Sequence, residues 1–172
     1  MAASGTINLN LTVAEVVPGG DGSASTTIDH AMSQFSGLTT TKSFAGSSTP
    51  TWTDAWSDTV DLAGGVATID LTALARQAPF EDVNLDTLKI VAYGFAGAAA
   101  NTAGIEVSQG ASAGYAIFGT ADDQVTVYPN QSIICASTAA ADLPTVAAGS
   151  ADEIDFTGTG TEQIHVLLIA GS

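Results

Sequence analysis

Few residues in this chain of 172 have the chemistry for catalysis. It contains two histidines, His30 and His165, and a single cysteine, Cys135. A lone cysteine cannot form an intramolecular disulfide, and because Cys135 follows two isoleucines we expect a buried, unreactive thiol. His165 lies in an apolar run, which indicates a core or interface histidine. His30 follows Asp29, but no nucleophile-elbow motif is present, so no Ser-His-Asp triad is predicted.

Acidic residues are the other chemical candidates. Glycosidases with a sandwich fold need two carboxylates that face each other across a groove, and calcium prefers clustered oxygen ligands. Eighteen acidic side chains make sequence neighbours common by chance, and the turns "GGDGS" and "TADDQ" lack the alternating spacing of a calcium loop. We therefore expect solvated surface charge, no catalytic residue, no cofactor and no metal, with a glycoside hydrolase as a third alternative. The carboxylates considered are Asp54, Asp58, Asp61, Glu81, Asp82, Asp122 and Asp123.

Both tryptophans occur in the polar stretch "TWTDAWSD". A pair of partly exposed indoles, Trp52 and Trp56, would stack on sugar rings or anchor a protein interface. The alternative is that both side chains cap one end of the hydrophobic core, and this reading is slightly favoured.

The elements that carry these residues are predicted to be strands. "TINLNLTVAEV" alternates with a period of two, and "DTVDLAGGVATIDLTAL" predicts a hairpin around Gly64 and Gly65. "DTLKIVAYGFAG" is apolar on both faces, as expected of a strand covered on both sides. Short strands separated by turn residues predict an all-β fold, an antiparallel β-sandwich that is jelly-roll-like. Further strands are predicted at "LTTTKSF", "GIEVSQ", "YAIFG", "DQVTVYP", "QSIICAS", "DEIDFTG" and "EQIHVLLIAG".

The last segment, "ADEIDFTGTGTEQIHVLLIAGS", is among the most apolar in the chain. Chain ends stay ordered when they are tied down, so we expect the final strand to lie inside a sheet, in a hairpin closed by "TGTG". Its second face is also largely apolar and must be covered, either by the other sheet or by a neighbouring subunit. The residues of that second face are His165, Leu167 and Ile169.

Length and charge limit the domain count and the partners. We expect a single β-sandwich domain over residues 1–172, with residues 1–55 as an N-terminal strand and loop-rich segment and residues 56–172 as the sandwich body. A formal net charge of −15 disfavours nucleic acid as a partner. The sequence has no signal-peptide pattern and no apolar stretch of roughly 18 residues, so neither export nor a membrane partner is expected.

Four segments, taken in order, resemble a loose family of small β-rich virion proteins of tailed bacteriophages, the capsid decoration or head-associated proteins. They are "WSDTVDLAGGVATIDLTAL", "LKIVAYGFAG", "VTVYPNQSIICAS" and "ADEIDFTGTGTEQIHVLLIAGS". The resemblance covers about residues 56–172 and rests on the pattern of strands and turns. Asn130 and Gln131 stand where the family pattern has glycines.

The resemblance implies a non-enzymatic capsid decoration or cement protein, made in the host cytoplasm and placed on the outside of the virion head. Its partner would be the major capsid protein, its oligomeric state a homotrimer, and no small-molecule substrate is expected. The acidic surface fits an external position better than one facing packaged DNA. The alternative function is a carbohydrate-binding or host-attachment module that uses Trp52 and Trp56. The candidate interface residues are Trp52, Trp56, His165, Leu167 and Ile169.

Overall fold

The computed structural model describes residues 53–75, 82–120, 122–137 and 143–172 in full, together with the backbone of residue 52 and of four strands between residues 5 and 44. The chain forms two compact units, residues 5–43 and the remainder. The sequence-based boundary at residue 55 and the single-domain assignment stay predictions. The turn "GGDGS", Glu81 and the side chain of His30 lie outside the described residues.

Two pairs of short strands make up the N-terminal part. β2 (Val13–Val17) pairs antiparallel with β3 (Thr26–His30), and β1 (Gly5–Asn8) pairs with β4 (Thr41–Phe44). The strand predicted at "LTTTKSF" is therefore confirmed in β4, while "TINLNLTVAEV" contains two strands, β1 and β2.

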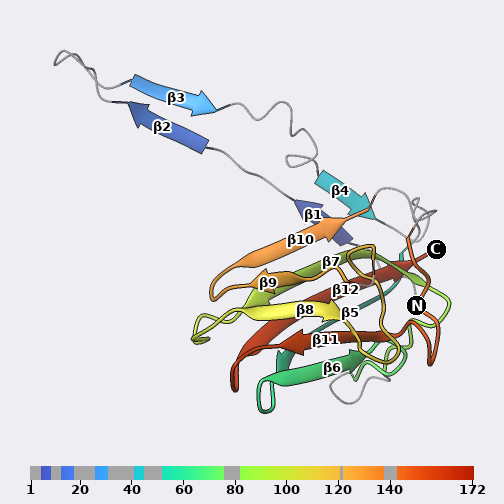
Figure 1. Ribbon diagram of the computed structural model, residues 1–172. Coiled ribbons are helices and arrows are strands. Elements are labelled where there is room, and N and C mark those ends of the chain that lie inside the picture. Colours follow the sequence, from blue (N-terminus) through green and yellow to red (C-terminus); the bar gives the residue numbers. More distant parts are fainter. Residues whose placement is uncertain are drawn as a thin grey trace. The chain divides into compact units, whose positions relative to one another are not determined.

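Two four-stranded antiparallel sheets pack face to face in the larger unit and form a β-sandwich (Figure 1). One sheet has the order β10-β7-β12-β5 and the other has the order β6-β11-β8-β9. The all-β sandwich expected from the sequence is confirmed. The eight strands are β5 (Trp52–Asp61), β6 (Val66–Asp70), β7 (Lys89–Gly97), β8 (Ile105–Gln109), β9 (Val125–Val127), β10 (Ser132–Ala136), β11 (Glu153–Thr157) and β12 (Gln163–Gly171).

The strand pairing is that of a jelly roll. When the eight strands are counted along the chain, the first pairs with the last, the second with the second last, and so on. β5 pairs with β12, β6 with β11, β7 with β10 and β8 with β9, all antiparallel. Two further pairs, β12 with β7 and β11 with β8, join these hairpin-like partners into the two sheets. Such nesting is what results when one long antiparallel ribbon is rolled into a two-sheet sandwich.

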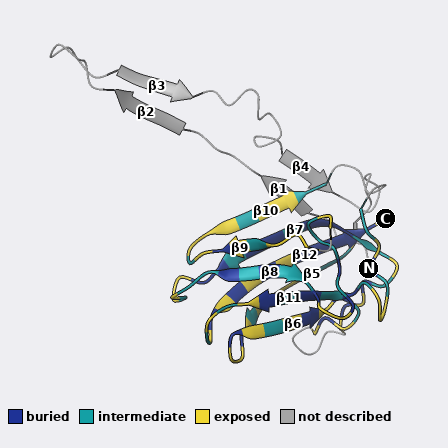
Figure 2. Cartoon of the chain, in the orientation of Figure 1, coloured by how far each residue is buried: buried dark blue, intermediate teal, exposed yellow. Residues whose placement is uncertain are grey.

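Alternating apolar residues fill the space between the sheets. On β12, Ile164, Val166 and Leu168 are buried while the side chains between them are exposed, as the period of two requires. β7 is buried on both faces along most of its length, which confirms the prediction for this doubly apolar strand. Figure 2 shows the contrast between the largely buried β7 and the exposed β10. Within the described residues, no helix is long and apolar enough to cross a membrane.

Both hairpins predicted from glycine-containing turns are wrong in the pairing of their strands, although the Gly64–Gly65 turn itself is closed by an antiparallel bridge between Ala63 and Val66. β5 and β6, which flank Gly64 and Gly65, lie in different sheets, and so do β11 and β12, which flank "TGTG". Each turn is instead an arch that carries the chain from one sheet to the other. The two arches are hydrogen-bonded to each other: Gly65 N–H donates to Gly160 O (2.7 Å), and Gly158 N–H donates to Gly65 O (2.7 Å). Gly65 has φ +87°, and a Cβ there would lie 2.8 Å from Gly158 O, so this position requires glycine.

The Glu162 carboxylate organises the second arch. Its Oε2 accepts hydrogen bonds from the N–H groups of Gly160 (2.6 Å) and Thr159 (3.2 Å), and its Oε1 accepts one from the Thr159 hydroxyl (2.8 Å). The Thr159 hydroxyl contributes most to lowering the pKa of Glu162; burial opposes this, and the backbone N–H groups add to the lowering. The ionised carboxylate is therefore the form that stabilises the arch.

We expect Glu162→Gln to lower the melting temperature at pH 7 and to have little effect near pH 3. A folded-state pKa below the unfolded value gives stability that is present above the unfolded pKa and is lost as the pH falls through the folded pKa. Thermal melts from pH 7 to pH 3 measure this difference. The control is Glu106→Gln, because that carboxylate accepts a hydrogen bond from an exposed side chain, Gln124 Nε2 (2.8 Å). An equal loss for Glu162→Gln at both pH values would contradict the assigned role.

"YAIFG" was predicted as a strand, and this is wrong. Residues 115–119 form a turn-containing segment in which Tyr115 is buried. The Tyr115 hydroxyl accepts a hydrogen bond from Ile90 N–H (3.1 Å) and donates one to Pro144 O (2.9 Å). Burial raises the pKa of Tyr115 to about 12. The apolar residues of this segment therefore anchor a loop to the core and are not part of a β-sheet.

Candidate functional site

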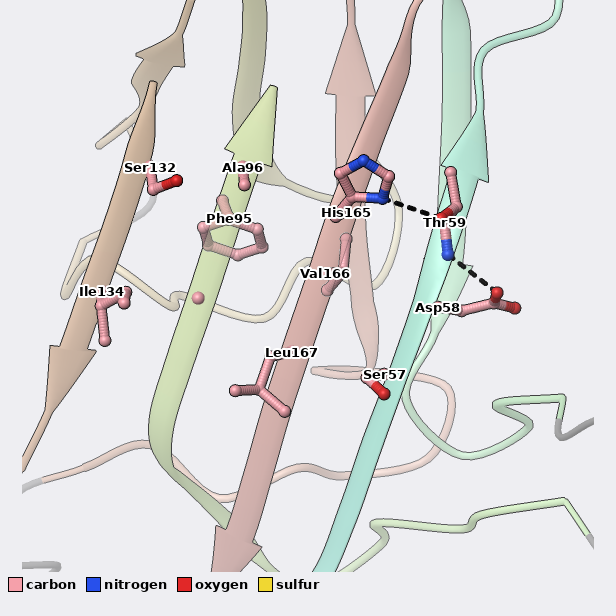
Figure 3. Close-up of a pocket in the computed structure, with 11 residues that line it drawn as sticks. Ser57, Asp58, Thr59, Phe95, Ala96, Ser132, Ile134, His165, Val166 and Leu167 are labelled. Atoms are coloured by element: carbon pink, nitrogen blue, oxygen red, sulfur yellow. Dashed lines mark hydrogen bonds between the residues drawn. The ribbon is translucent and has the colours of Figure 1, made fainter. Parts of the chain in front are cut away.

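A groove runs over the outer face of the β10-β7-β12-β5 sheet, the face turned away from the second sheet. Its volume is about 580 Å³. Strand register aligns its side chains in two rows that cross all four strands. Figure 3 shows most of them projecting from the sheet. One row is Thr59, His165, Ala96 and Ser132, and the other is Ser57, Leu167, Gly94 and Ile134.

Small residues on β7 form the floor of the groove. Gly94 and Ala96 occupy the positions between the taller side chains of β10 and β12. A Cβ at Gly94 would lie 3.7 Å from Leu167 Cβ and 3.8 Å from Ile134 Cγ1, which are ordinary contact distances. Glycine is thus not forced by the backbone at this position, and its effect is to leave the groove open.

The walls of the groove expose apolar side chains. Ile134 on β10 is 46% exposed and Leu167 on β12 is 38% exposed. They are two of the four large apolar side chains that are exposed in the described residues, and their position in one hollow is a feature of contact sites.

One polar pair in the groove resembles a nucleophile and its base. The Thr59 hydroxyl lies 2.8 Å from His165 Nδ1, while Thr59 N–H donates to Asp58 Oδ1 (2.8 Å). Nucleophilic catalysis also needs a third group that orients the base. The structure gives His165 no such partner within the described residues, and both Thr59 and His165 are exposed to water. The pair is a cross-strand contact between β5 and β12.

The carboxylates considered from the sequence, apart from the undescribed Glu81, are not gathered into one site in the described residues. Asp58 is the one acidic residue in the described lining of the groove, so a glycosidase pair across it is not formed there. Asp61 accepts a hydrogen bond from Gln163 Nε2 (2.6 Å), and Asp123 accepts one from Thr120 N–H (3.1 Å) in the "TADDQ" turn. In the described ranges, no three His, Cys, Asp or Glu side chains are placed to hold a metal ion.

The structure brings two of the five candidate interface residues together. His165 and Leu167 line the groove side by side on β12. Ile169 is the next alternate residue along β12, but it is only 4% exposed, so it is not available as a surface residue. Trp56 is 6% exposed and its indole N–H donates to Ala75 O (2.8 Å), as in the core-capping alternative. The side chain of Trp52 lies outside the described residues.

Sequence reasoning missed β10 as part of the site. Cys135 was expected to be buried, but it is exposed, because β10 is the edge strand of its sheet and little covers its inward side. Cys135 lies opposite Tyr93, whose pKa is raised mainly by burial and secondarily by the neighbouring thiol. Edge strands usually carry charges, so the uncharged sequence "SIICA" indicated burial and contained no local signal of an edge position.

The groove and the acidic surface are the features from which function can be inferred. A jelly roll by itself hosts many unrelated functions. No family model matches the chain, and neither a curated protein nor a solved structure is significantly similar to it.

Proposed function

We propose that the chain is a non-enzymatic structural protein of a virion, a decoration or cement protein bound to the outside of a tailed-phage head. The observation that carries the proposal is the groove: a hollow with exposed Ile134 and Leu167 and without a catalytic arrangement, on a protein of net charge −15. The resemblance of residues 56–172 to small virion proteins supports the same function.

Binding to a capsid shell needs a local surface that can lose its water without burying unpaired charge. The groove provides this, because most of its lining is apolar or hydroxyl-bearing. Carboxylates elsewhere keep the protein soluble and repel DNA, so the exterior of the head is the favoured position. The partner would be the major capsid protein, and a homotrimer would sit at threefold positions.

The alternative, a carbohydrate-binding module, depended on two accessible indoles. Trp56 is buried with its N–H hydrogen-bonded, so stacking on a sugar would require the core to open. This observation ranks capsid binding above glycan binding.

Heads that lack this protein provide the test. Purified protein added to them should bind at a fixed number of copies and raise the temperature at which the heads release DNA. Leu167→Glu should abolish binding, because it places a charge in the groove that must be desolvated on contact. The matched control is Val66→Glu, a change of an exposed apolar residue (58%) in the other sheet, which should still bind.

Two results would overturn the proposal. One is that heads neither bind the protein nor contain it when purified from their host. The other is glycan-array binding that is lost in Trp52→Ala, which would establish the carbohydrate alternative. The number of copies bound at each threefold position of decorated heads tests the trimer separately.

A further inference from the structure

β10 differs from the other three strands that end one of the two four-stranded sheets. Edge strands expose unpaired N–H and C=O groups, and proteins usually protect them with charges or by keeping them short. β9 has three residues, β6 ends with Asp70, and β5 carries Asp54, Asp58 and Asp61. β10 has none of these protections: its sequence is SIICA, and the described chain pairs no strand with its outer side.

The uncharged character extends beyond the strand. No Asp, Glu, Lys or Arg occurs in residues 124–141, whereas eighteen acids are distributed over the rest of the chain. A second copy of a protein with net charge −15 is repelled by most of this surface. At physiological ionic strength the repulsion is screened beyond about 8 Å, so a contact made through an acid-free strand avoids most of it.

Hydrogen bonds at both ends of the β10–β7 pair show which backbone groups point outward. Gly97 N–H donates to Gln131 O (3.0 Å), and Ser137 N–H donates to Val91 O (2.8 Å). In an antiparallel ladder, residues alternate between those bonded to the partner strand and those facing away. The register has no shift along β10, so the backbone N–H and C=O groups of its odd-numbered residues point toward β7. The residues that direct N–H and C=O toward the open edge are Ser132, Ile134 and Ala136.

We propose that β10 pairs antiparallel with β10 of a second copy, about a two-fold axis through Ile134. Ile134 is the middle residue of this five-residue strand, so this register uses the whole strand. Ile134 then lies opposite its own copy, and Ser132 lies opposite Ala136 of the second copy. All outward N–H and C=O groups of the strand are satisfied, and the contact is closed and self-complementary.

The same pairing covers exposed apolar surface. The groove row of Leu167, Gly94 and Ile134 runs across the sheet toward the open edge. Pairing through β10 continues this row into the identical row of the second copy, so that Ile134, now 46% exposed, packs against Ile134 of that copy. A basic partner would instead be drawn to the acidic surfaces, which favours a second copy at this uncharged edge.

This inference goes beyond the proposed function and does not depend on it, because it concerns the purified protein alone. It is a two-fold contact, distinct from the threefold arrangement proposed on the capsid. Analytical ultracentrifugation of the full chain should show a species of twice the chain mass of 17.2 kDa. Ile134→Glu, which places two carboxylates face to face on the axis, should lose this species and still unfold in one cooperative transition, as an intact folded monomer does. Val66→Glu, the same change on an exposed residue of β6, should keep it.

Disulfide trapping tests the register. In a Cys135→Ser background, Ile134→Cys should cross-link under mild oxidation, because residues opposite each other across the axis have Cα atoms about 5.5 Å apart. Ser132→Cys in the same background should not cross-link, because the two copies of residue 132 lie at opposite ends of the pair. A monomer at all concentrations, a trimer unaffected by Ile134→Glu, or cross-linking through residue 132 instead of 134 would each overturn the proposal.

Discussion

Removal of residues 164–172 will abolish folding of the sandwich. These residues are most of β12, which lies between β5 and β7, so the deletion removes both of its ladders and splits the sheet. Burial of Ile164, Val166, Leu168 and Ile169 contributes roughly 1.5–3 kcal/mol per side chain. Their sum is comparable with the whole net stability of a typical domain, about 5–15 kcal/mol.

Calorimetry and near-UV circular dichroism measure this effect. The truncated chain should show no cooperative transition and no fixed aromatic signal. Two neighbouring leucines on β12 provide the matched control: Leu168 is 0% exposed and Leu167 is 38% exposed. Leu168→Ala should destabilise by about 2–5 kcal/mol and Leu167→Ala by about 0.5 kcal/mol or less. A truncated protein that melts cooperatively near the parent temperature would show that β12 is not a central strand.

The sequence predicted the strands well because each rests on a local signal. Alternation within β12 and the double-sided apolarity of β7 are read over a few residues, and both are confirmed. The central position of β12 was also predicted, since an apolar chain end must be covered to stay ordered.

Connectivity was predicted less well because it depends on distant residues. A strand, a glycine turn and a second strand have the same local pattern whether the turn closes a hairpin or arches between sheets. The arch at Gly64 and Gly65 is decided by its hydrogen bonds to Gly158 and Gly160, about ninety residues away along the chain. Periodicity within one segment contains no information about such a partner.

The candidate site was predicted in part for the same reason. His165 and Leu167 were found because they lie on the second face of one apolar strand, which local pattern reveals. Ile134 was missed because its exposure follows from the edge position of β10, a property of sheet order. Trp56 is buried, as in the slightly favoured core-capping reading, and Ala75 O accepts a hydrogen bond from its indole N–H, a tertiary contact that the local sequence pattern does not contain.

Phe156→Ala should destabilise the protein by about 3–5 kcal/mol, the usual loss when a large buried ring is truncated. Phe156 on β11 is 0% exposed, and its ring meets that of Phe95 on β7 edge to face, with 6.2 Å between centroids and 69° between planes. These strands belong to different sheets, so the pair is part of what holds the two layers together.

Urea unfolding of Phe156→Ala, Phe95→Ala and the double variant separates the ring contact from the cavity that each change creates. Edge-to-face pairs contribute about 0.5–1.5 kcal/mol beyond burial. The stability lost in the double variant should therefore be smaller than the sum of the two single losses by that amount. Phe156→Leu, which keeps most of the apolar volume, should lose clearly less stability than Phe156→Ala. If the two single losses add exactly to the loss in the double variant, the contact between the two rings contributes nothing beyond burial. A loss below about 1 kcal/mol for Phe156→Ala would be inconsistent with close packing of the two sheets at this point, since truncation of a buried ring in a close-packed core leaves a cavity that the surrounding side chains fill only in part.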